Sequence, residues 1–122
     1  MAHGHSDIGR LLDDAGYARA TAESLQALAT PSRLRILARL HAGPAAVGEL
    51  AAEVGLEASA VSHQLRILRH LGLVIGVRDG RRVVYELHDD HVGELLTQAV
   101  GHVDHVRLGL AGRERGRIET AA

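Results

Sequence analysis

The sequence predicts a mainly α-helical fold with one two-stranded β-hairpin, and three observations carry this prediction. Apolar residues recur every three or four positions through most of the chain, which is the spacing of amphipathic helices. Residues 73–87 instead hold two runs rich in β-branched residues around an Asp-Gly pair, the pattern of a hairpin. The chain has two tyrosines and no phenylalanine or tryptophan, so its core must consist of aliphatic side chains, which suit packed helices.

The length of 122 residues fits one domain with short tails. We expect residues 1–7 to be a flexible, histidine-containing tail, residues 8–110 to form the domain and residues 111–122 to be a disordered tail. The chain has no cysteine, which excludes disulfides, thiolate metal sites and cysteine nucleophiles. No apolar run reaches the length of a membrane span, and no signal peptide is recognisable, so we expect a cytoplasmic protein without a membrane partner.

The N-terminal half of the domain predicts two helical regions. The first spans residues 8–28, and we expect Gly16 to divide it into two helices, with Thr21 capping the second. In the next helix Thr30 is a good N-cap and Pro31 suits the first turn. Gly43 and the proline that follows it end this helix.

Residues 47–54 and 58–71 predict two short helices joined by a tight turn at Gly55, which is the arrangement of a helix-turn-helix. The second helix carries polar side chains that donate to phosphates or reach base edges. The alternative is an ordinary solvated helix face. Our candidate DNA contacts on this helix are Ser59, Ser62, His63, Gln64, Arg66 and Arg69.

A hairpin directly after such a helix pair makes a winged helix. Residues 73–77 and 82–87 predict its strands, and its tip carries Arg78, Arg81 and Arg82. Arginines at such a tip can lie along a phosphate backbone or enter a minor groove. A solvated loop tip is the common alternative, but the position after the helix pair favours contact with double-stranded DNA. Between residues 58 and 88, five arginines face only two acidic residues, which is a basic footprint.

The last predicted helix, residues 90–108, has a wide apolar stripe with one small member, Ala99, where a partner helix can approach closely. The stripe consists of Val92, Leu95, Leu96, Ala99, Val103 and Val106. We therefore expect a homodimer formed through the N- and C-terminal helices.

Asp89, His91, His102 and His105 form the pattern D-x-H-x10-H-x2-H on and before this helix. On a helix, His91 and His102 share a face but lie about 16 Å apart. Metal–nitrogen bonds are about 2 Å long, so one helix cannot bring both rings to one ion. An antiparallel copy can, and two-fold symmetry then gives two equivalent inter-subunit sites. The alternative is a set of surface histidines on a dimer helix.

Three segments resemble the ArsR/SmtB family of metal-sensing repressors: LATPSRLRIL at 28–37, SAVSHQLRILR at 59–69 and GRRVVYEL at 80–87. The resemblance implies dimeric winged-helix proteins that bind operator DNA when metal-free and release it when metal binds. It also implies that His63 is a DNA contact and not a ligand. The family's other common site needs a cysteine pair near residues 46–54, and this chain has none. The final-helix site matches at each position.

The first residues, MAHGH, are similar to the start of the NmtR-like nickel and cobalt sensors within that family, whose extra ligands come from the N-terminus. Four nitrogen and oxygen ligands suit tetrahedral Zn²⁺, whereas Ni²⁺ and Co²⁺ favour more ligands. The two missing ligands of an octahedral ion can come from His3, His5 or the amine of Ala2. We therefore favour Ni²⁺ or Co²⁺ as the effector, with Zn²⁺ next and two solvated tail histidines as the alternative.

These observations predict a metal-responsive repressor and not an enzyme, since no nucleophile–base set or phosphate loop is recognisable. One alternative is a repressor of the same fold that does not sense metal alone and responds to another ligand or a partner protein. Another is a metal buffer that binds no DNA, against which the basic hairpin argues.

Overall fold

The structure is a computed structural model that describes residues 8–121, with side chains described through residue 109. Six helices and three strands lie within this range. In chain order they are α1 (Arg10–Asp13), α2 (Ala15–Ala27), α3 (Pro31–Ala42), β1 (Ala45–Ala46), α4 (Val47–Val54), α5 (Ala58–His70), β2 (Val74–Asp79), β3 (Arg82–Leu87) and α6 (Asp90–Ala121). The winged helix-turn-helix predicted from the sequence is confirmed.

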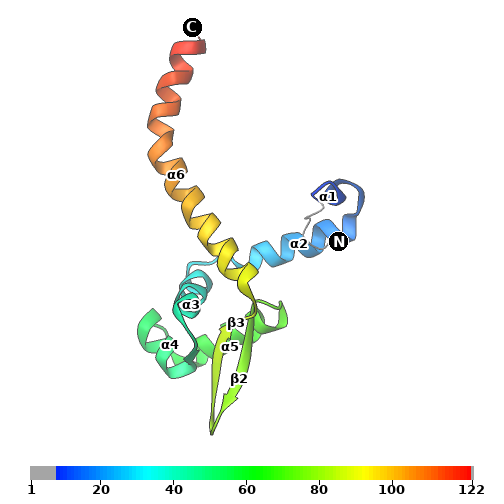
Figure 1. The fold of residues 1–122 in the computed structure, drawn as a ribbon, viewed down its shortest axis with the longest axis vertical. Helices are drawn as coiled ribbons and strands as arrows, with labels where there is room; N and C mark the ends of the chain where they lie inside the picture. The colour runs from blue at the N-terminus through cyan, green and yellow to red at the C-terminus, as the bar shows by residue number, and fades with distance from the viewer. Residues whose placement is uncertain (1–7, 122) are drawn as a thin grey trace.

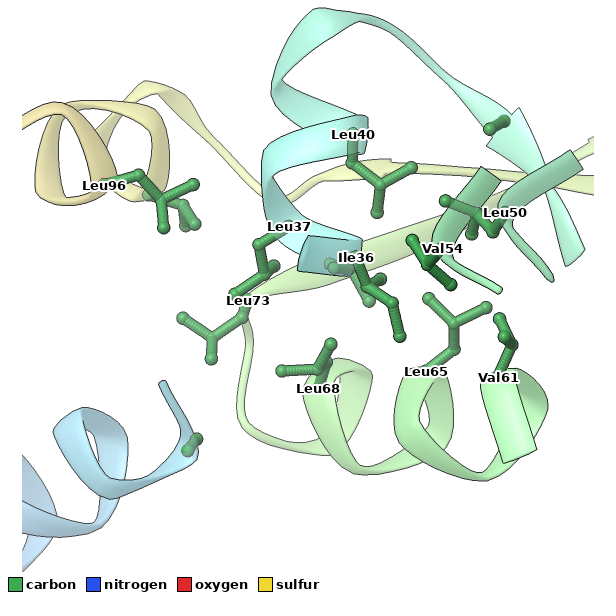
Figure 2. Packing of buried hydrophobic residues seen from close by; sticks show 14 of the residues in the cluster. Ile36, Leu37, Leu40, Leu50, Val54, Val61, Leu65, Leu68, Leu73 and Leu96 are labelled. Carbon is green, nitrogen blue, oxygen red and sulfur yellow. The ribbon is translucent and has the colours of Figure 1, made fainter. Parts of the chain in front are cut away.

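Helices α3, α4 and α5 and the sheet form the body of the molecule, and α6 extends far beyond it (Figure 1). Each of these three helices buries one aliphatic face against the others, as Figure 2 shows. Burying a leucine, valine or isoleucine contributes roughly 1.5–3 kcal/mol, so this small cluster supplies most of the driving force for the body. The largest fully buried side chains are those of Ile36, Leu37, Leu50, Val61, Leu65, Leu68 and Val74.

The sheet has three antiparallel strands in the order β1-β3-β2. Its hairpin closes with Asp79 opposite Arg82, and Gly80 takes a left-handed φ of 67° in the turn. β2 ends at Asp79, two residues later than predicted. β1 was missed because two alanines show neither alternation nor high β-propensity.

The break in the N-terminal helical region lies at Asp14, not at Gly16 as predicted. The Asp14 carboxylate accepts a hydrogen bond of 2.9 Å from the backbone N–H of Tyr17, which caps α2. This bond and that of the Arg10 side chain lower the pKa of Asp14 below its usual value, and partial desolvation opposes them. Thr21 is not a cap either, because it lies inside α2 with its hydroxyl donating to the carbonyl of Tyr17.

Helix α6 continues to Ala121, well past the predicted end at Leu108. No proline follows that point, and glycine costs a helix only about 1 kcal/mol, so its three glycines there do not stop it. The disorder predicted for residues 111–122 stays a prediction. The predicted flexible tail of residues 1–7 lies outside the described residues.

Thr30 caps α3 as the sequence predicted, since its hydroxyl accepts from the backbone N–H of Arg33 at 3.3 Å. We expect Thr30→Ala to lower the free energy of unfolding by about 1 kcal/mol, because that N–H loses its partner. Thr21→Ala is the matched control and should change it little, since alanine is the better helix former. Urea denaturation at one fixed protein concentration measures both. Equal losses for the two variants would contradict the cap.

Candidate DNA interface and metal-ligating residues

The turn between α4 and α5 sets the angle of the helix pair. Gly55 ends α4 with a φ of 70° and a ψ of 37°, the left-handed conformation that glycine adopts without strain. Its N–H donates to the carbonyl of Ala51, and the chain re-enters a helix three residues later at Ala58. The α4–turn–α5 unit is thus the predicted helix-turn-helix.

The orientation of α5 follows from its core side, which is completely buried. With Val61, Leu65 and Leu68 facing the body, the opposite side must face solvent. Ser59, His63 and Arg66 lie on that outer side at helical spacing and are exposed. Arg69 is exposed further along, and Ser62 is half-buried. These side chains therefore form one continuous polar surface.

Gln64 does not share this surface. It lies about 100° around the helix from His63 and is half-buried. Its Oε1 accepts a hydrogen bond of 2.6 Å from Nε of Arg33 on α3. Gln64 is therefore a predicted DNA contact on α5 whose side chain is instead hydrogen-bonded within the protein.

The three arginines of the wing tip are all exposed, but their surroundings differ. Nη1 of Arg82 lies 3.4 Å from Oε1 of Glu49 on α4, and Nε of Arg82 lies 3.9 Å from Oδ2 of Asp79. Within the described part of the chain, Arg78 and Arg81 have no such partner. Two cations are therefore available at the tip, whereas the third is already shared with α4.

Asp89 stands at the start of α6, where β3 has just ended. Its Oδ1 accepts from the backbone N–H of His91 at 3.0 Å and of Val92 at 3.3 Å, so it caps the helix. Its Oδ2 lies 3.0 Å from Nδ1 of His88, and Nδ1 of His91 lies 3.5 Å from its Oδ1. The structure thus brings Asp89 and His91 together, as one half of the predicted ligand set.

The same neighbours keep Asp89 ionised. The hydrogen bond from the His88 ring is the main cause that lowers the pKa of this carboxyl below its usual value of 3.8. Partial desolvation opposes this shift, and the N–H of Val92 and the charge and N–H of His91 support it. At neutral pH the side chain is therefore a carboxylate, the form in which it can bind a cation.

His102 and His105 lie on α6 and are exposed. His102 follows His91 by eleven positions along the helix, which corresponds to about 16 Å. No three histidine or carboxylate side chains among the described residues converge on a point where a metal ion would fit. One chain thus presents two pairs of nitrogen and oxygen donors, and each pair alone is too small for a tetrahedral site. His3, His5 and Ala2 lie outside the described residues.

An apolar groove of about 370 Å³ runs between α3 and α6. Val100 and Val103 are 61% and 50% exposed, so much of the stripe on α6 has no cover from its own chain. The apolar side chains that line the groove are Leu34, Ala38, Leu96, Ala99, Val100 and Val103.

The model of the arsR family of bacterial regulatory proteins matches residues 30–75, from the cap of α3 to the start of β2. The transcriptional regulator NmtR of Mycobacterium tuberculosis is 56% identical over 100 residues, covering 82% of this chain and 83% of NmtR. The chain belongs to the arsR family. Its fold is similar to the solution structure of apo-NmtR, with a TM-score of 0.68 over 79% of this chain and 81% of that one.

Two further relatives extend the comparison. A transcriptional repressor SmtB homolog of Synechocystis is 46% identical, covering 70% of this chain and 65% of the homolog. The homodimeric winged helix-turn-helix DNA-binding domain Mb0332 of Mycobacterium bovis is 32% identical, with a TM-score of 0.70 over 88% of this chain and 94% of that one. Relatives of this arsR-family chain are thus DNA-binding transcriptional regulators. No helix in the described range is long and apolar enough to cross a membrane.

Two contacts of this arsR-family site were not predictable from the sequence: that of Arg33 with Gln64 and that of Glu49 with Arg82. The partners lie 31 and 33 residues apart, so no local pattern links them. From the sequence, Arg82 was predicted as a DNA contact and Arg33 was given no role, because only the folded body brings their partners near.

The wing arginines differ in what they can offer to DNA. We expect Arg81→Ala to weaken DNA binding and to lower the slope of log K against log salt by about 0.9, the value for one lost phosphate contact. Arg82→Ala should have a smaller effect, because Arg82 must first leave Glu49. Fluorescence anisotropy at four salt concentrations measures both slopes. A larger effect of Arg82→Ala would contradict this order.

Proposed function

We propose that this arsR-family protein is a metal-responsive transcriptional repressor. Its homodimer binds operator DNA when metal-free and is released by Ni²⁺ or Co²⁺, with Zn²⁺ as the alternative effector. The observation that carries the proposal is the division of the ligand set on α6 into two distant pairs, directly after a winged helix-turn-helix. As a regulator of the cell's own DNA, the protein acts in the cytoplasm.

DNA recognition falls to α5 and the wing. The exposed surface of Ser59, His63 and Arg66 enters the major groove, where hydroxyl, imidazole and guanidinium groups reach base edges and phosphates. Ser62 and Arg69 border this surface. In a two-fold dimer the two α5 helices read half-sites about one DNA turn apart, and Arg78, Arg81 and Arg82 contact the flanking backbone.

Dimerisation follows from the apolar surface that the single chain leaves uncovered. The exposed valines of α6 are joined by Leu12 and Leu25 on the N-terminal helices, at 90% and 53% exposure. We expect these side chains to form the dimer interface, because large exposed apolar patches mark protein–protein contact sites. The relative Mb0332, whose winged helix-turn-helix domain is homodimeric, supports a homodimer.

Metal recognition falls to Asp89 and His91 of one chain and to His102 and His105 of the other. The donor set fits a borderline metal, because it consists of three imidazoles and one ionised carboxylate with no sulfur. When bound, the metal supplies a cross-link between two α6 helices that the protein alone lacks. Two ligands from among His3, His5 and the amine of Ala2 complete the six that Ni²⁺ or Co²⁺ favours.

The coupling between the two sites is a difference in free energy between two dimer arrangements. Asp89 and His91 lie at the start of α6. Metal that joins them to α6 of the second chain therefore fixes the relative orientation of the two protomers. If that arrangement misplaces the two α5 helices, DNA affinity falls. By reciprocity, operator DNA must weaken metal binding by the same factor.

His102→Ala should leave metal-free DNA binding intact and abolish metal-driven release, because each site loses one of its four ligands. Asp104→Asn is the matched control, since it lies between the two histidines but outside the pattern. The measurement is fluorescence anisotropy on the DNA upstream of the gene, without metal and then with Ni²⁺, Co²⁺ and Zn²⁺ in turn. Release of the His102→Ala variant from DNA by metal would refute the ligand assignment. If metal releases neither the wild-type protein nor any variant, the protein is a repressor that responds to another signal.

The tail ligands are tested separately. We expect the His3→Ala/His5→Ala variant to lose most of its response to Ni²⁺ and Co²⁺ while keeping any response to Zn²⁺, because four ligands still satisfy a tetrahedral ion. Isothermal titration with each metal, followed by the anisotropy assay, measures both properties. An unchanged Ni²⁺ response would remove the tail from the site.

A further inference from the structure

Arg33 connects three elements through one side chain. Its Nε donates to Oε1 of Gln64 on α5 at 2.6 Å, and its Nη1 donates to the carbonyl of Ala27, the last residue of α2, at 3.5 Å. Both contacts are partly buried, so water competes with them less than at an open surface. One guanidinium thus spans the end of α2, the start of α3 and the middle of α5.

The backbone that carries this side chain is itself held in place. The N–H of Arg33 donates to the hydroxyl of Thr30, and Pro31 restricts the first turn of α3. Within the described range no carboxylate pairs with the Arg33 guanidinium. Its Nε–H is therefore directed at the neutral amide of Gln64, in a hydrogen bond that the charge of the donor strengthens.

The hydrogen bond between Arg33 and Gln64 restricts the rotation of α5 about its own axis, which the hydrophobic core does not. The leucines and valine on the inner side of α5 hold it against α3 and α4, but hydrophobic contact is non-directional and permits small rotations about the helix axis. A hydrogen bond is directional, and Gln64 lies near the middle of α5 on its flank. It therefore opposes rotation of α5, which would displace Ser59, His63 and Arg66 together.

We propose that Arg33 is a positioning residue for operator recognition and that Gln64 acts through Arg33 instead of reading DNA. The pair sets the rotational position of α5 relative to α3 and the end of α2. This proposal rests on the proposed DNA-binding function, and it replaces the sequence-based prediction of Gln64 as a DNA contact.

A double-mutant cycle tests the pair on the full-length dimer. Arg33→Met, Gln64→Met and the double variant are each titrated against operator DNA and against a scrambled duplex of equal length. We expect each single variant to weaken operator binding about fivefold to tenfold, a part of what a charged hydrogen bond contributes. The double variant should weaken it by the same factor and not by the product, because one interaction is lost in all three.

Binding to the scrambled duplex, and its salt dependence, should stay unchanged apart from the effect of one lost charge. Arg35→Met measures that effect, since Arg35 is exposed on the same helix. A salt slope that falls by about 0.9 more for Arg33→Met than for Arg35→Met would mean that Arg33 contacts a phosphate, which overturns the proposal. Multiplicative losses in the double variant overturn it as well.

Gln64→Glu provides a test that does not depend on the folding of an Arg33 variant. Glutamate keeps an acceptor for Arg33 but removes the amide donor that contact with a base would need. Its negative charge should weaken binding to the operator and to the scrambled duplex by the same factor. We expect the ratio of operator to scrambled affinity to be preserved, and its collapse would mean that Gln64 reads a base. A wild-type protein that does not distinguish the two duplexes would instead overturn the proposed function.

Discussion

The buried aliphatic face of α5 is the constraint on which the rest of the structure depends. Val61, Leu65 and Leu68 are almost wholly removed from solvent, and α3 and α4 are packed around them. Because a helix has only one opposite side, burying this face decides which side chains face outward. The same packing brings Glu49 beside Arg82 and Arg33 beside Gln64, so the polar contacts that adjust the interface are consequences of the core.

Helix α6 differs from α5, because a single chain does not bury its apolar face. Among the α6 residues whose side chains are described, Val92 and Leu96 near its start belong to the buried core, and the stripe beyond them is largely exposed. The candidate ligands follow the same division, with Asp89 and His91 at the anchored end and His102 and His105 on the free part. A second chain is required both to cover the stripe and to complete the ligand set. The absence of a partner for α6 within its own chain therefore accounts for both the expected homodimer and the expected inter-subunit metal site.

Most of the fold could be predicted from sequence because local signals mark its elements. Thr30, Gly55 and the Asp-Gly pair at the hairpin each mark a cap or turn by chemistry that acts within a few residues. β1 and the break at Asp14 were missed, since two paired alanines and an aspartate among several turn-compatible residues carry weak local signals. In the site, the exposed face of α5 followed from periodicity, whereas the side-chain partners of Arg33 and Arg82 depend on tertiary packing that no local pattern encodes.

The position of Asp89 explains how an event on α6 can reach the wing. Asp89 follows β3 after a single residue, His88, whose ring contacts its carboxylate and whose backbone N–H donates to the carbonyl of Leu73 just before β2. The carboxylate that caps α6 is therefore tied to both strands of the hairpin within one short connection. Any ligand that draws on Asp89 must compete with the His88 ring and the N–H groups of His91 and Val92. A metal ion at this carboxylate, as the proposed function requires, would therefore change contacts at the base of the wing.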